Sequence, residues 1–170
     1  MNNPTDQEHK AQAPTSIGCM VITCSDTRTP ETDTSGQLIR KLLEGKNHTI
    51  VTYHVVKDDP GQILFRIAQG TANDAIQAII VNGGTGISRR DSTFEAVDGI
   101  LEKRLSGFGE IFRVLTYQEI GSSAMMSRAT AGIVKGRILF SVPGSENAVR
   151  LAMEKLILPE LGHLVEELTK

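Results

Sequence analysis

The chain has 170 residues, a length that is most simply one domain and is enough to bury a core without disulfides or metals. Apolar residues make up 39% and charged residues 22%, as in a globular protein, and the net charge of −2 gives no global reason to expect nucleic acid as a partner. The absence of Trp and the presence of only two Tyr also disfavour a base-stacking platform.

The N-terminal segment over residues 1–15 is polar, contains two prolines and shows no hydrophobic periodicity. We therefore expect a flexible tail there and a single domain over residues 16–170. The first apolar run, over residues 17–23, is too short to span a bilayer and follows no basic signal-peptide start. No membrane contact and a cytoplasmic location are the default expectations.

The two cysteines, Cys19 and Cys24, have opposite parity within one predicted strand, so their side chains should point to opposite faces of the sheet. This arrangement predicts two buried thiols rather than a disulfide or a shared metal. The four histidines show no ligand spacing, which disfavours a zinc site.

The first half of the chain alternates between strand and helix patterns. Apolar, β-branched runs predict buried strands over residues 17–23, 49–56 and 78–82, and helical spacing predicts helices over residues 35–43 and 61–69.

The second half of the chain begins with helical spacing and ends with a hairpin and a long helix. We expect helices over residues 93–104 and 107–120, a hairpin of residues 132–135 and 137–142, and a final helix over residues 146–158 that Pro159 kinks or ends. Met125 and Met126 are expected to lie in the core.

This alternation predicts an α/β fold with three layers, a mostly parallel sheet carrying helices on both faces. The hairpin should add an antiparallel edge. Ligands in such folds bind beyond the carboxyl ends of the strands. The loops that follow the first three strands read S-D-T-R-T, K-D-D-P-G and G-G-T-G-I-S-R-R-D, and the P-G-S turn joins them if the strand over residues 137–142 runs parallel.

The stretch over residues 79–96 carries the strongest local signal. A buried strand ends in glycines at Gly83, Gly84 and Gly86, and a helix follows shortly after Asp91. Glycine lets backbone N–H groups approach a ligand closely, as in phosphate-binding loops. Neither of the two common phosphate motifs, G-x-x-x-x-G-K-[ST] and G-x-G-x-x-G, is present.

The loops after the first three strands also carry carboxylates, hydroxyls and cations. The carboxylates are Asp26, Asp58, Asp59 and Asp91, the hydroxyls are Ser25, Thr85, Ser88, Ser92 and Thr93, and the cations are Arg28, Arg89 and Arg90. Carboxylates that hold Mg²⁺ beside phosphate-binding cations are the groups that phosphoryl or nucleotidyl transfer needs.

Each of these signals also has a simpler explanation. Asp91 could be a helix N-cap, Arg89 and Arg90 could lie in solvent, and the turn over residues 143–145 could be an ordinary turn with a cap. Only the convergence of the loops at one sheet edge favours a functional site.

The segment N-G-G-T-G-I-S-R-R-D-S-T-F-E-A-V resembles the G-G-T-G-x-x-x-x-D-x-T-P-E-A signature of the MoaB/Mog family of molybdenum cofactor biosynthesis proteins. The similarity spans nearly everything after the tail. It includes the S-D-T-R start with D-x-S-G, the stretches G-F-G-E-I-F-R and E-I-G-S-S-A-M-M-S-R-A, and V-P-G-S. The G-F-G-E stretch is closer to the MoaB branch.

The resemblance implies the molybdopterin-binding fold, assembled as a homotrimer or homohexamer, with other cofactor-biosynthesis proteins as further partners. The implied reaction is adenylylation of molybdopterin by ATP, which gives adenylyl-molybdopterin and pyrophosphate. The catalytic aspartates would be Asp58, with Asp59 as a register alternative, and Asp91, both acting through Mg²⁺.

The same resemblance implies a substrate-binding site. Gly83, Gly84, Thr85 and Gly86 would cradle the pterin phosphate. The other implied binding residues come from the loops after the first and third strands, from the P-G-S turn and from the segment before the hairpin: Ser25, Asp26, Ser88, Thr93, Ser127, Arg128, Pro143, Gly144 and Ser145.

Two departures from the family pattern are Phe94 in place of proline and K-D-D in place of P-D-E after the second strand. Two alternatives to the adenylyltransferase remain. One is a non-catalytic molybdopterin-binding or scaffold protein of the same fold. The other is a multi-domain enzyme built on this fold, for which 170 residues leave no room.

Overall fold

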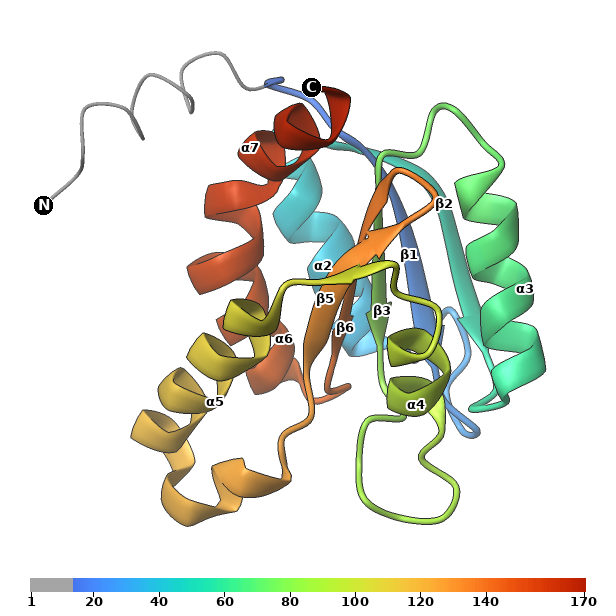
Figure 1. Ribbon diagram of the computed structural model, residues 1–170. Coiled ribbons are helices and arrows are strands. Elements are labelled where there is room, and N and C mark those ends of the chain that lie inside the picture. The colour runs from blue at the N-terminus through green and yellow to red at the C-terminus, as the bar shows by residue number, and fades with distance from the viewer. Residues whose placement is uncertain (1–13) are drawn as a thin grey trace, which may run out of the picture.

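The computed structural model describes residues 14–170, which form a six-stranded sheet with helices on both faces (Figure 1). Most of the predicted flexible segment, residues 1–13, lies outside the described residues. The strands are β1 Gly18–Cys24, β2 Thr49–Val56, β3 Ala78–Asn82, β4 Lys103–Arg104, β5 Thr130–Val134 and β6 Arg137–Val142. The helices are α2 Thr34–Glu44, α3 Pro60–Thr71, α4 Thr93–Asp98, α5 Ser106–Ile120, η1 Gly121–Met126, α6 Glu146–Ala152, η2 Met153–Ile157 and α7 Leu158–Thr169.

The strand order in the sheet is β2-β1-β3-β6-β5-β4. The first four strands run parallel, with β6 aligned on β3 from the pair Ala78 and Ile138 to the pair Asn82 and Val142. Strands β5 and β4 add the antiparallel edge. The predicted α/β class is therefore confirmed, and the parallel direction of β6 brings the P-G-S turn to the same edge as the other three loops.

The sheet separates two apolar cores. One contains buried residues of α2, α5, α6 and α7, and the other contains buried residues of α3 and α4 (Figure 1). Cys19 belongs to the first core and Cys24 to the second, and both are free thiols. The opposite parity of the two cysteines and their burial are thus confirmed.

The predicted helix over residues 93–104 is wrong in its second half. Helix α4 ends at Asp98, with Gly99 as its C-cap, and Lys103 and Arg104 form strand β4. Strand β4 lies close against β5 at Gly132, where an added Cβ would be only 2.2 Å from the Lys103 carbonyl oxygen. The apolar residues that suggested a longer helix still pack against the second core, but from a loop.

Of the two alternatives predicted at Pro159, a kink or an end of the helix, the end is wrong, because α7 runs through Pro159. The widened π-helical turn η2 follows α6, and α7 then continues to Thr169. Pro159 occupies the first turn of α7, where a missing N–H is tolerated.

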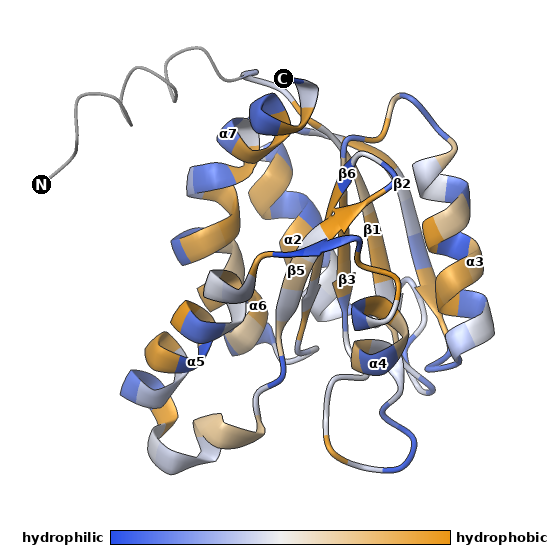
Figure 2. Ribbon diagram, viewed as in Figure 1, coloured by the Kyte–Doolittle hydropathy of each residue, from blue (hydrophilic) through white to orange (hydrophobic). Residues whose placement is uncertain are grey.

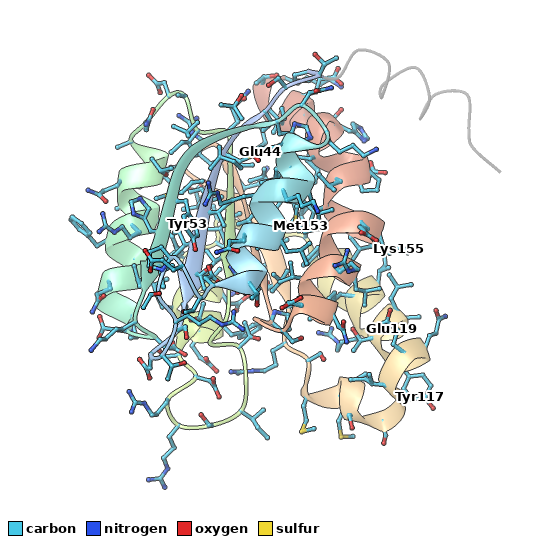
Figure 3. All side chains as sticks on the ribbon, turned by 180° about the vertical axis from the view of Figure 1, so that it is seen from behind. Glu44, Tyr53, Tyr117, Glu119, Met153 and Lys155 are labelled. Atoms are coloured by element: carbon cyan, nitrogen blue, oxygen red, sulfur yellow. The ribbon has the colours of Figure 1, made fainter. Side chains whose placement is uncertain are left out.

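The predicted burial of Met125 and Met126 is wrong, since they are 80% and 51% exposed. Met125 lines one cavity together with Val114 and Tyr117 of α5, which are also exposed. The ribbon of α5 and η1 carries several hydrophobic residues (Figure 2). Figure 3 shows Tyr117 projecting from α5 away from the sheet. Within residues 14–170, no helix combines the length and hydropathy needed to cross a membrane.

Candidate functional site

A pocket of about 550 Å³ lies at the carboxyl edge of the parallel strands. It receives residues from the loop after β1, the glycine loop after β3, the end of η1 and the turn after β6. Its lining residues are Cys24, Ser25, Thr27, Arg28, Gly83, Gly84, Thr85, Gly86, Asp91, Met126, Ser127, Pro143, Gly144 and Ser145. Ten of these residues were predicted binding or catalytic residues.

The glycine loop has a backbone that requires glycine at two positions. Gly83 and Gly84 have φ angles of 102° and 59°, values that L side chains rarely adopt. A Cβ at Gly83 would lie 2.2 Å from the Cys24 carbonyl oxygen, and the Gly83 N–H donates to Val142 O at 3.0 Å. The loop is therefore packed directly against the ends of β1 and β6.

Asp58 approaches the glycine loop from the end of β2. Its Oδ1 accepts hydrogen bonds from Ser92 N, Ser92 Oγ and Thr93 Oγ1 at 3.3, 3.0 and 3.1 Å. A Cβ at Gly84 would lie 2.4 Å from Asp58 Oδ2. The neighbouring Asp59 instead caps α3 by accepting from Gln62 N at 2.9 Å. Of the two register alternatives, only Asp58 reaches the loop.

Asp91 closes the glycine loop from its other end and lines the pocket. Its Oδ2 accepts from Ser88 N at 3.0 Å and would lie 2.5 Å from a Cβ at Gly86. The N-cap position of α4 belongs to Ser92, so the explanation of Asp91 as a helix cap is wrong. Asp58 and Asp91 are thus each packed on a different glycine of one loop.

The P-G-S turn serves both as a helix cap and as a pocket wall. Ser145 caps α6 by accepting from Ala148 N at 3.3 Å. Gly144 lies so close to the glycine loop that a Cβ added to Gly144 would be 3.0 Å from Gly83 Cα. Both explanations of the turn therefore hold.

Arg128 supports the glycine loop from behind and is not among the pocket lining. Its guanidinium donates to Thr85 O at 2.9 Å and to Gly86 O, and it forms an ion pair with Glu95. The hydrogen bond from Arg128 is the main reason that the pKa of Glu95 lies below its usual value. Arg128 therefore holds the backbone of the glycine loop in place and does not line the pocket.

The remaining predicted residues lie around the pocket. Asp26 forms an ion pair with Arg90 at 2.7 Å on the exposed rim, where the Arg90 side chain is 81% exposed. Ser88 is exposed in the loop, and Thr93 is buried beneath Asp58. The exposure of Arg90 fits the solvated-loop explanation of this arginine.

The sequence prediction did not assign a role to Asp33, which is fully buried beside the pocket residue Arg28. Burial alone would raise the pKa of Asp33. Hydrogen bonds from Thr23, Tyr53, Gly36 N and Ser35 outweigh that effect and lower it. The D-x-S-G motif, with Asp33 as helix cap and Ser35 and Gly36 as its donors, was the signal that could have identified this carboxylate.

The carboxylates of Asp58 and Asp91 are the candidate ligands for a divalent cation at the glycine loop. Asp58 Oδ2 and Asp91 Oδ1 accept no hydrogen bond from the described residues, so each carboxylate offers one uncommitted oxygen. No cluster of three or more His, Cys, Asp or Glu side chains suited to a metal occurs within residues 14–170. The pair of carboxylates fits Mg²⁺ better than a cation that needs three or more protein ligands, because Mg²⁺ typically binds one or two carboxylates together with substrate phosphates.

Comparison with known proteins identifies the type of domain. Residues 20–163 match the family model described as "Probable molybdopterin binding domain". Molybdenum cofactor biosynthesis protein B of Bacillus anthracis is 52% identical over 162 residues, which cover 95% of this chain and 96% of that protein.

Solved structures give the same result. A crystal structure of molybdenum cofactor biosynthesis protein B has a TM-score of 0.90 at 51% identity and covers 93% of this chain and 99% of its own. The tungsten cofactor synthesizing protein MoaB from Pyrococcus furiosus has a TM-score of 0.84 at 36% identity, with 93% and 100% coverage.

Proposed function

This chain belongs to the molybdopterin-binding domain family and is a molybdenum cofactor biosynthesis protein of the MoaB type, and we propose from that premise that it adenylylates molybdopterin. In this reaction an oxygen of the terminal phosphate of molybdopterin attacks the α-phosphorus of ATP. The bond between the α- and β-phosphates breaks, and pyrophosphate leaves. The products are adenylyl-molybdopterin and pyrophosphate.

One observation carries this proposal, namely the two carboxylates on the glycine loop. Asp58 is packed on Gly84 and Asp91 on Gly86, so both carboxylates lie at the loop that would hold a phosphate, with Asp91 in the pocket lining and Asp58 outside it. A protein that only binds the pterin needs the loop but has no evident use for two such carboxylates. Their placement therefore favours catalysis.

Mg²⁺ would be held by Asp58 and Asp91 together with substrate phosphates, and its charge would offset the negative charge of the transferring group. The chain itself supplies positioning. The glycine loop offers backbone N–H groups to a phosphate, and the P-G-S turn and Ser127 bound the pocket. Hydrogen bonds from Ser92 and Thr93 hold the Asp58 carboxylate in place.

The test is product formation. Purified protein with molybdopterin, ATP and Mg²⁺ should release pyrophosphate and yield adenylyl-molybdopterin, and neither should form without the pterin. Asp91→Asn should retain pterin binding and lose at least about 100-fold in turnover, the size expected when one charge-stabilising group is removed. Absence of product from wild-type protein that binds the pterin would favour the non-catalytic binder.

The proposal includes self-association as a homotrimer or homohexamer. Its support is the exposed apolar surface on α5 and η1, which includes Val114, Tyr117 and Met125 around a cavity of about 620 Å³. A single domain rarely exposes such a contiguous apolar patch without a partner. Light scattering tests this point, and a monomer at micromolar concentration would contradict it.

A further inference from the structure

Arg28 is the one cation among the described residues that line the pocket, where Asp91 is the one carboxylate. Arg28 comes from the loop after β1, and its side chain is 30% exposed. Two other arginines near the site have partners outside the pocket. Arg128 holds the glycine loop from behind, and Arg90 pairs with Asp26 on the rim.

The contacts of Arg28 are confined to one edge of its guanidinium. Nη1 donates to Gly144 O at 3.2 Å and to Ser35 Oγ, and it lies 3.4 Å from Asp33 Oδ1. Nε and Nη2 donate no hydrogen bond to any residue in the described part of the chain. An arginine anchored through Nη1 keeps its Nε and Nη2 edge, the pair of donors that binds a phosphate or carboxylate in a bidentate manner.

The carboxylate that anchors Arg28 is itself buried and hydrogen-bonded. Asp33 is fully buried and also accepts from Tyr53 Oη at 2.6 Å and from Gly36 N at 3.0 Å. Hydrogen bonds keep the pKa of Asp33 below its usual value despite burial, so the carboxylate is charged at neutral pH. A buried charge needs a partner, and Arg28 is the cation that meets it.

Two further elements fix the same network. Ser35 Oγ, which accepts from Arg28, lies 2.9 Å from Asn82 Oδ1 at the end of β3. Asn82 Nδ2 in turn donates to Thr23 Oγ1 at 2.8 Å in β1. Through these contacts, the position of Arg28 is set by β1, β3, α2 and the P-G-S turn together.

We propose that Arg28 binds a substrate phosphate through its Nε and Nη2 edge and that buried Asp33 is the residue that positions it. This inference rests on the proposed function, because it assumes that the pocket receives phosphorylated ligands. The phosphate can belong to the pterin or to ATP, and the experiment separates these two sources.

The experiment measures equilibrium binding of molybdopterin and, separately, of ATP with Mg²⁺ to wild type and to Arg28→Gln. The affinity for the ligand whose phosphate contacts Arg28 should fall by about 10- to 100-fold, as expected for the loss of a charged bidentate contact. Arg28→Lys should lie between the two, because lysine keeps the charge and lacks the fork. Arg66→Gln on α3 makes the same change in net charge away from the pocket and should bind as wild type.

Asp33→Asn separates positioning from general structure. It should weaken phosphate binding in the wild-type background and have no further effect in the Arg28→Gln background. An equal loss in both backgrounds would show that Asp33 acts without Arg28. Thermal melting of each variant confirms that the protein compared is folded.

The outcomes distinguish a failure of the role proposed for Arg28 from a failure of the proposed function. If wild type binds neither ligand, the proposed function fails, and the inference fails with it. If wild type binds one or both and folded Arg28→Gln binds them equally well, only the role of Arg28 is overturned. A loss confined to molybdopterin assigns the contact to the pterin phosphate, and a loss confined to ATP assigns it to the nucleotide.

Discussion

The guanidinium of Arg128 lies over the ring of Phe94, with 4.8 Å between its central carbon and the ring centroid. Phe94 stands where the family signature has proline. The chain therefore lacks the fixed φ angle that proline would give the first turn of α4, and has instead a contact between Phe94 of α4 and Arg128, which holds the glycine loop. The same guanidinium donates to two carbonyls of the glycine loop.

The contact between Arg128 and Phe94 predicts that substituting the two residues lowers the free energy of unfolding by different amounts. Phe94→Leu should lower the free energy of unfolding by about 0.5–1 kcal/mol, the size of a partly exposed cation–π interaction. Arg128→Met should lower it by about 2–3 kcal/mol, because the loop carbonyls and Glu95 lose a charged donor. Urea unfolding measures both values. Equal costs would mean that Arg128 does not hold the loop.

The adjacent pair Asp58 and Asp59 offers a matched comparison for catalysis. Asp58→Asn should lower adenylyl transfer by at least about 100-fold, because its carboxylate is the one placed on the glycine loop. Asp59→Asn should leave turnover within about twofold, since asparagine is an equally good helix cap. Steady-state kinetics of the two variants decides the matter, and a larger loss from Asp59→Asn would reverse the assignment.

Gly84 is a position where one methyl group should disrupt the site. Its φ angle is 59°, and a Cβ would lie 2.1 Å from Thr93 Oγ1 and 2.4 Å from Asp58 Oδ2. Gly84→Ala should therefore lower the free energy of unfolding by about 1–3 kcal/mol and displace Asp58. Gly107→Ala in α5 is the control, because nothing lies within 4 Å of its Cβ. It should leave stability unchanged or raise it by up to about 1 kcal/mol.

The two thiols should be unreactive in the native protein. Burial raises the pKa of Cys19 and Cys24 to about 12, although Cys24 contributes to the pocket wall. A disulfide reagent at pH 8 should label the folded protein at least about 100-fold more slowly than the unfolded chain, in which two thiols react. Rapid native labelling would show that the pocket opens further at Cys24.

Asp33 should make stability depend on pH in a defined direction. Its pKa in the folded protein is lowered, so its contribution is complete above the usual aspartate value near 4 and is lost as the pH falls through the folded value. Asp33→Asn lacks that contribution. Denaturant unfolding should show a gap between wild type and variant of about 1–3 kcal/mol at pH 7 that narrows below about pH 4. A gap that stays constant would mean that the carboxylate is not charged at neutral pH.

The sequence predicted the parallel strands and most helices because each has a strong local pattern. It was wrong at β4, where Ile100 and Leu101 continue the helical spacing of α4. These two residues can pack against the core from a loop as well as from a helix. The helix ends at Gly99, and the residues that follow pair with β5. Periodicity records which residues are buried, and strand pairing across about 30 residues is not visible in a local window.

The site was predicted in a similarly uneven way. The glycine loop, Asp91 and the P-G-S turn carry their own sequence signals and lie together at the pocket. The family resemblance implied Arg128 as a binding residue, while its side chain holds the glycine loop from outside the pocket lining. Asp33 was missed because a helix cap and a buried charge look alike in sequence, and only the tertiary structure brings Arg28 to it.

In the π-turn η2 the hydrogen bonds run from residue i to residue i+5, so this turn holds one residue more than an α-helical turn. The turn absorbs that residue locally, and Val149 in α6 and Leu161 and Val165 in α7 are all buried in the first core. Deleting one residue from Met153–Ile157 would therefore convert the turn to an ordinary α-helix and leave α7 in register on the sheet.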